Sequence, residues 1–182
     1  MSTSSPAEPD LRYPIGKLNR KSQLSDDERR AAVDVIATAP RELRQAVAGL
    51  SDAQLDTPYR PGGWTVRQLV HHVADSHMNA YGRFRLAFTE QNPTIKPYDE
   101  AKWAELDDAR TMPIEISLTL LDAMHERLVM LLRSASEDRF QRTLSHPDNG
   151  PMTVDSLLSI YSWHGRHHTA HVTALRHRMN WS

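Results

Sequence analysis

The sequence of 182 residues contains no cysteine. Disulfide bonds, a thiolate nucleophile on the protein and any zinc site with cysteine ligands are therefore excluded. The chain has no apolar run of eighteen residues, and Met1 to Asp10 lacks the apolar stretch of a signal peptide, so we expect a cytoplasmic protein. The formal charge is −1, with acidic and basic residues interspersed, which argues against nucleic acid or a membrane as partner.

Histidine, in contrast, is concentrated near the C-terminus. Four of the ten histidines lie between Trp163 and His171. The pairs His164/His168 and His167/His171 are four residues apart, which places each pair on one face of a helix. That spacing lets a helix offer two imidazoles to one metal ion. A third ligand must come from elsewhere, and a second cluster supplies three candidates: His71, His72 and His77.

Helix signals divide the chain into one domain over residues 25–182, preceded by an extended tail over 1–24 that packs on it. Capping boxes at Ser25 and Thr65 each start a helix. The expected long helices run from 26 to about 50 with a kink or break at Pro40, from 66 to before Asn92, from Pro113 to about 134, and from 153 onward. The fold class is all-α, a four-helix bundle with long connecting loops.

The connections are expected to be mostly irregular. A short helix capped by Asp99 is predicted at about 100–106 inside the long connection 92–112. A turn is expected at 136–140, and residues 143–152 are predicted to form a loop or a small hairpin. No convincing strand is visible in the sequence.

The last helix places histidines where a bundle has core residues. Steps of four and three along one seam pass through Leu157, Tyr161, His164, His168, His171 and Leu175. A buried imidazole without a partner costs free energy, so these histidines need hydrogen bonds or a metal. His167 is expected to point away from this seam.

In the second helix, spacing does not choose the ligand. Its apolar positions put His72 at one side of the inward face, His77 nearer the centre and His71 more outward. His125 has no partner at metal spacing. Acid–base or supporting roles are open for Asp75, Asp155 and His146, although each is equally typical of a cap or turn.

Several motifs in one order resemble the YfiT branch of the DinB-like superfamily. They are Tyr13 to Gly16, Leu55 to Arg60, Gly62 to Gln68, His71 to Asn79, Pro97 to Glu100 and Trp163 to His171. The resemblance implies a DinB-like four-helix fold, a homodimer and one divalent metal ion per subunit. The three histidine ligands of the family fall on His72, His164 and His168.

Three hypotheses for function follow. The first is a hydrolase in which the metal activates water on a small-molecule substrate. The second is an S-transferase that conjugates a low-molecular-weight thiol, such as bacillithiol, to electrophiles, with carboxylates held by Arg60, Arg67, Arg83 or Arg166. The third is a non-enzymatic metal-binding helical module. Zinc is the expected metal for neutral imidazoles, with nickel or another divalent ion as alternatives.

Overall fold

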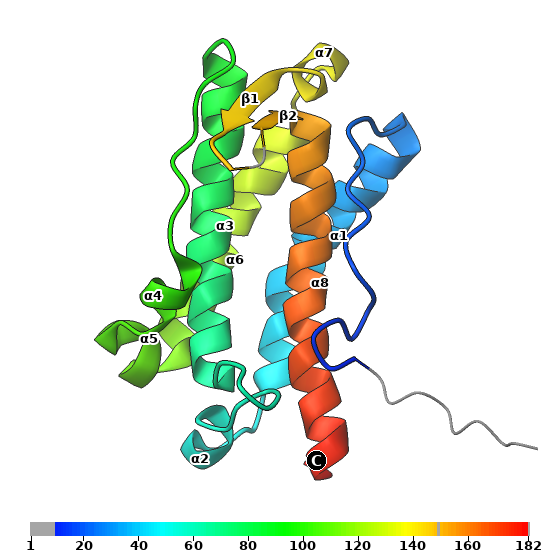
Figure 1. Cartoon of the computed structure of the whole chain (residues 1–182). Helices are drawn as coiled ribbons and strands as arrows, with labels where there is room; N and C mark the ends of the chain where they lie inside the picture. The colour runs from blue at the N-terminus through cyan, green and yellow to red at the C-terminus, as the bar shows by residue number, and fades with distance from the viewer. Residues whose placement is uncertain (1–9, 149, 182) are drawn as a thin grey trace, which may run out of the picture.

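Four long helices form the bundle (Figure 1). They are α1 (Asp26–Val47), α3 (Val66–Thr89), α6 (Ile114–Arg133) and α8 (Val154–Met179). The coordinates are a computed structural model that describes residues 10–148 and 150–181. Both α1 and α3 pack against α6 and α8, so the first two long helices occupy opposite corners of the bundle. The predicted four-helix bundle is confirmed.

The helix starts are those that the capping signals predict. At α1 the Ser25 side chain accepts from the Glu28 amide while the Glu28 carboxylate accepts from the Ser25 amide, and Thr65 and Gln68 do the same at α3. Helix α1 passes through Pro40 as one element and ends at Val47. Proline has no amide hydrogen, so the carbonyl of Ile36, four residues earlier, loses its helical donor.

Short elements join the long helices. They are α2 (Asp52–Leu55), α4 (Glu100–Ala104), α5 (Asp107–Thr111), α7 (Glu137–Phe140), β1 (Thr143–His146) and β2 (Gly150–Thr153). The two strands pair antiparallel, with Leu144 opposite Met152, both buried. A hairpin is therefore the right alternative for 143–152, and the expectation of no strand is wrong. Strands of four residues are too short for alternation to stand out in the sequence.

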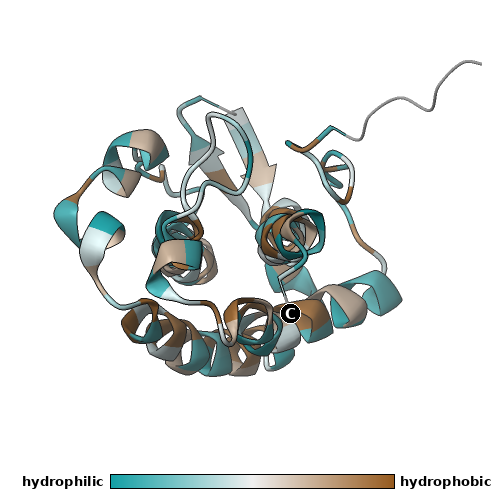
Figure 2. Ribbon diagram, turned by 90° about the horizontal axis from the view of Figure 1, so that it is seen from below, coloured by the Kyte–Doolittle hydropathy of each residue, from teal (hydrophilic) through white to brown (hydrophobic). Residues whose placement is uncertain are grey.

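The core consists of two apolar clusters, one at each end of the bundle. One contains Val33 and Ile36 of α1 and Leu157 of α8, and the other contains Leu43 of α1 and Leu175 of α8. Figure 2 looks up from below, with α3 and α8 nearly end-on and α1 and α6 along one side of them. Between the two clusters lies a layer of buried histidines, contributed by α3, α6 and α8.

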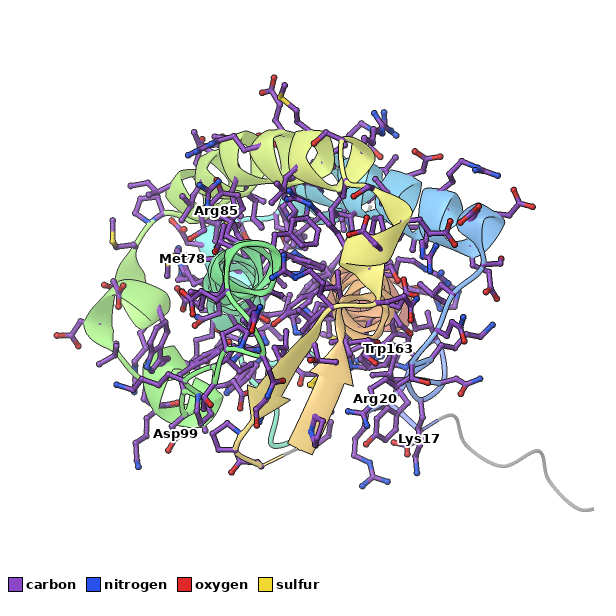
Figure 3. All side chains as sticks on the ribbon, turned by 90° about the horizontal axis from the view of Figure 1, so that it is seen from above. Lys17, Arg20, Met78, Arg85, Asp99 and Trp163 are labelled. Atoms are coloured by element: carbon purple, nitrogen blue, oxygen red, sulfur yellow. The ribbon has the colours of Figure 1, made fainter. Side chains whose placement is uncertain are left out.

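The N-terminal segment 10–24 runs along the bundle beside α8 (Figure 1). The Lys21 amide donates to the Ser159 hydroxyl over 3.3 Å, and Leu24 at its end enters the core. Figure 3 shows Trp163 on the side of α8 that faces this segment, which carries Lys17 and Arg20. The part of the predicted tail that is described thus packs on the domain, and residues 1–9 lie outside the described residues.

Within the described part of the chain, no helix is both long and apolar enough to cross a membrane.

Two helical glycines give a matched test of close helix packing. A Cβ added at Gly165 of α8 would lie 3.2 Å from the Cβ of Ala39 in α1, whereas one added at Gly82 of α3 would meet nothing within 4 Å. Gly82→Ala is expected to stabilise the protein by up to about 1 kcal/mol through helix propensity. Gly165→Ala should gain clearly less, because α1 must yield. Urea unfolding of both variants measures the difference, and equal gains would contradict the close contact.

Candidate metal centre

Three histidines from two helices converge at one point of the bundle. His72 of α3 and His164 and His168 of α8 each offer a ring nitrogen, and these atoms all lie within 4.8 Å of one another. The Nε2 atoms of His72 and His164 are 3.3 Å apart. Two nitrogens bound tetrahedrally to zinc at about 2.0–2.1 Å are separated by about 3.3 Å. The spacing of this pair therefore fits a shared metal ion.

The protonation of these rings also suits a metal. Burial lowers the pKa of His72 to about 4, and burial together with the neighbouring histidines holds the pKa values of His164 and His168 well below the ordinary range. All three imidazoles are therefore neutral near pH 7, the form that binds metal. The Nδ1 atom of His168 is buried without a hydrogen-bond partner among the described residues. The donor set fits a divalent ion.

A cavity of about 660 Å³ opens beside the three histidines. Its wall combines bundle helices with segments that lie outside them: the N-terminal segment, the loop before α3, the connection before α4 and the β hairpin. From the bundle come Ser76, Arg83 and Tyr161, and from the other segments come Tyr13, Arg60, Trp64, Tyr98, Glu100 and His146. The volume is that of a small-molecule site.

The Ser76 hydroxyl lies next to the candidate ligand nitrogen of His164. The Ser76 oxygen lies 3.5 Å from Nε2 of His164. Ser76, Tyr98 and Tyr161 all line the cavity. Arg83 donates to the Tyr161 hydroxyl over 2.9 Å. Burial raises the pKa of Tyr98 and of Tyr161, so both phenols keep their protons and remain donors. The sequence does not assign Ser76 or Tyr98 to the site. Ser76 stands four residues after His72 on the same helix, but a helical serine carries no metal-binding signal of its own, and Tyr98 lies in the connection before α4.

His167 and His171 lie in the same cavity wall. His167, which is expected to point away from the core seam, is not at the surface: only 7% of the residue is exposed, and it lines the cavity with His164 and His168. It stacks on Trp163 with 4.1 Å between ring centroids, and Tyr13 of the N-terminal segment covers it. His171 donates through Nε2 to the Arg12 carbonyl over 3.3 Å. Burial lowers the pKa of both histidines to about 4.

The three histidines of the second cluster, His71, His72 and His77, lie in different surroundings. His72 reaches the convergence point. His71, expected to point outward, is buried between α3 and α6, where Nδ1 lies 2.7 Å from the Ser117 hydroxyl and Nε2 lies 3.1 Å from the Met112 carbonyl. His77 does not join the three-nitrogen group but contacts it, because its Nε2 lies 3.2 Å from Nδ1 of His164.

Several other predicted candidates lie away from the cavity. Asp155 is fully buried in an ion pair with Arg29, and the half-buried Asp75 has its pKa raised to about 6 by burial and by nearby Asp108. Arg67 pairs with Asp52 and Asp56 near the start of α3. Arg166 is exposed. His146, Arg60 and Arg83 do line the cavity.

The described residues form a four-helix bundle with three neutral imidazoles beside a cavity of small-molecule size. The protein therefore falls in the class of helical proteins with a candidate divalent-metal site. The family model described as DinB superfamily matches residues 36–172, and the chain belongs to this superfamily.

Named relatives agree with this assignment. A Bacillus cereus protein named putative metal-dependent hydrolase is 52% identical over 172 residues, which cover 94% of this chain and 99% of the relative. A Bacillus anthracis protein with the same name shows the same identity and coverage.

Solved structures share the fold. YfiT from Bacillus subtilis, described as a probable metal-dependent hydrolase with an unusual four-helix bundle topology, is 47% identical. The match covers 94% of this chain and 99% of YfiT, with a TM-score of 0.92. The four-helix bundle protein TT2238 is 20% identical, with a TM-score of 0.58, over 80% of this chain and 98% of its own. That second likeness concerns the fold alone.

Proposed function

We propose that the protein is a metal-dependent hydrolase of a small-molecule substrate, with one divalent ion held by His72, His164 and His168. The observation that carries the proposal is the 3.3 Å separation of the Nε2 atoms of His72 and His164 beside a cavity of about 660 Å³. A divalent ion bound by neutral imidazoles with open positions supplies a Lewis acid that lowers the pKa of bound water to about 7. The printed names of the relatives support the same reaction class.

The protein's own groups would bind and orient the substrate. Tyr161 remains protonated and receives a hydrogen bond from Arg83, so its hydroxyl can donate to an oxygen on which negative charge develops. Glu100 lines the same cavity and would accept a proton from substrate or water. In this proposal Arg83 and Tyr161 stabilise charge, and Glu100 moves a proton.

A second function is favoured by the cations of the cavity. Arg60 and Arg83 line it, and neither has a carboxylate within ion-pair distance among the described residues. Unpaired guanidinium groups bind carboxylates well. A low-molecular-weight thiol that carries carboxylates would fit there, and the protein would then be an S-transferase.

Zinc and a homodimer are part of the proposal. Zinc suits three neutral imidazoles, with nickel or another divalent ion as alternatives. Ile116 and Leu120, one turn apart on α6, are both exposed and give an apolar face that a second copy could cover. We propose that the metal-bound protein acts on its substrate in the cytoplasm as a dimer.

One assay separates the functions. Protein loaded with Zn²⁺, Ni²⁺, Co²⁺ or Mn²⁺ is tested on esters, amides, halides and other electrophiles, with and without added thiol. We expect turnover without thiol, and a loss of at least about 100-fold in His164→Ala, because a ligand and with it the Lewis acid are removed. His177→Ala, at the exposed end of α8, is the matched control and should retain activity.

Each other outcome points to a different function. Turnover that requires thiol would replace the hydrolase with the S-transferase. No turnover, together with unfolding on chelation, would indicate a structural metal in a non-enzymatic module, since structural sites make folding depend on the metal. Thermal melting with and without chelator provides this second measurement.

A further inference from the structure

A continuous line of hydrogen bonds crosses the histidine layer and ends on a candidate ligand. The carbonyl oxygen of Ile36 lies 2.7 Å from Nδ1 of His125. Nε2 of His125 lies 2.8 Å from Nδ1 of His77, and Nε2 of His77 lies 3.2 Å from Nδ1 of His164. The four long helices contribute one residue each. His77 and His125 are both buried, at 1% and 2% exposure.

Pro40 in α1 explains why the Ile36 carbonyl is free to accept a hydrogen bond from His125. The Ile36 carbonyl would normally accept from the amide of residue 40, but Pro40 has no amide hydrogen. A buried carbonyl without a donor is costly, and the His125 ring supplies the missing donor. Pro40 therefore frees a backbone acceptor in the middle of the bundle, at the level of the histidines.

The carbonyl sets the tautomer of every ring after it. A carbonyl only accepts, so the proton of neutral His125 is on Nδ1 and its Nε2 is an acceptor. His77 must then carry its proton on Nδ1 to donate to His125, which leaves Nε2 of His77 as an acceptor. His164 must in turn donate from Nδ1 to His77. Its Nε2 is left with a free lone pair, directed toward Nε2 of His72.

Room for this arrangement comes from Gly165, which follows His164 on α8. A Cβ at position 165 would lie 3.7 Å from Cε1 of His77, and any larger side chain would displace that ring. Apolar clusters lie on both sides of the layer, and His77 is only 1% exposed, so its ring nitrogens depend on partners within the protein. The rings of His77 and His125 are thereby held in place by packing.

We propose that His77 and His125 are positioning residues that fix His164 as the Nδ1–H tautomer and direct its Nε2 to the metal. The inference rests on the metal site of the proposed function, but not on the reaction catalysed there. A ligand histidine whose second nitrogen donates to a fixed acceptor is oriented and made more basic, and loss of such a partner typically weakens metal binding by about 10–100-fold.

The tautomer is tested first, on the metal-free protein. Two-dimensional ¹H–¹⁵N NMR of histidine rings at about pH 7.5 distinguishes Nδ1–H from Nε2–H. We expect Nδ1–H for His164, His77 and His125 in the wild type, and loss of the pure Nδ1–H form of His164 in His77→Leu. An Nε2–H tautomer of His164 in the wild type would overturn the proposal, whatever the metal or activity.

Metal affinity is tested second, with Zn²⁺ in competition with a chelator and with the visible spectrum of the Co²⁺ form. His77→Leu removes donor and acceptor and should weaken Zn²⁺ binding by about 10–100-fold, with a changed Co²⁺ spectrum. His77→Gln keeps one donor and one acceptor and should recover part of the affinity. If His77→Leu does not fold, His125→Leu, which breaks the line one ring further away, takes its place with a smaller expected loss.

His71→Gln is the matched control. His71 is a buried histidine on the same helix, but its ring bonds to Ser117 and Met112 and makes no contact with His164 that the structure records. Its Zn²⁺ affinity should equal that of the wild type. Equal Zn²⁺ affinities for His77→Leu, His77→Gln and the wild type would contradict the positioning role. If the wild type binds Zn²⁺ and His77→Leu binds it more weakly, but neither protein turns over a substrate, the result counts against the hydrolase and leaves the positioning role standing.

Discussion

The metal-free protein is expected to lose stability steeply as the pH falls from about 6.5 to about 4. Burial lowers the pKa of His72, His167 and His171 to about 4 in the folded state, against 6.5 for an ordinary histidine. Within this window the unfolded chain binds protons that the folded chain does not. The free energy of unfolding therefore decreases as the pH decreases, by up to about 1.4 kcal/mol per pH unit for each histidine.

The pH dependence of stability can be tested for one histidine at a time with a variant that does not bind a proton. The stabilising contribution is fully present above pH 6.5 and is lost as the pH falls toward about 4. His167→Phe keeps a ring to stack on Trp163 but cannot bind a proton. Urea unfolding at about pH 7.5, 5.5 and 4.5 should give this variant a slope shallower by up to about 1.4 kcal/mol per pH unit. Identical slopes for variant and wild type would show that His167 titrates normally.

The second large effect is expected at the buried ion pair. Asp155 has no exposed surface and accepts from two nitrogens of Arg29 at 2.9 Å, from the Leu24 amide at 3.0 Å and from Gln141 at 2.9 Å. Asp155→Ala leaves the largely buried guanidinium without its main partner. The free energy of unfolding should fall by about 3–5 kcal/mol, as when one partner of a buried pair is removed.

An exposed pair provides the comparison. Asp34 bonds to Arg133 over 2.7 Å, but both side chains are mostly in solvent. Asp34→Ala should change the unfolding free energy by no more than about 0.5 kcal/mol. Because Asp155 does not line the cavity, Zn²⁺ affinity measured on folded Asp155→Ala should match the wild type. A loss of stability below about 1 kcal/mol in Asp155→Ala would contradict this account of the pair.

Local signals in the sequence suffice for much of the fold. The capping boxes at Ser25 and Thr65 place the starts of α1 and α3, and the apolar stripes give the long helices. The ends are less well predicted, since α1 stops at Val47 rather than near residue 50. The hairpin 143–153 is stabilised by the burial of Leu144 and Met152, which depends on elements far away in the sequence.

The site is predictable only where its members share a helix. The spacing of His164 and His168 is a local property of α8, but the choice between His72 and His77 depends on the rotation of α3 against α8. Resemblance to the family, and not periodicity, singles out His72. The burial of His167 depends on Tyr13, which is 154 positions away in the sequence. The line from Ile36 through His125 joins four helices and has no sequence spacing of its own.

The composite wall of the cavity bears on how such a protein can change during evolution. The candidate ligands and their supporting histidines belong to the bundle, where a substitution disturbs close packing. Much of the remaining wall belongs to the N-terminal segment, two connections and the hairpin, which tolerate substitutions and changes of length. Descendants of one ancestor can thus acquire different substrate preferences through these peripheral segments while they inherit the same metal-binding apparatus. Among relatives, variation at the hairpin residues of the wall, His146 and Met152, should track the substrate, and variation at Pro40 should be rare.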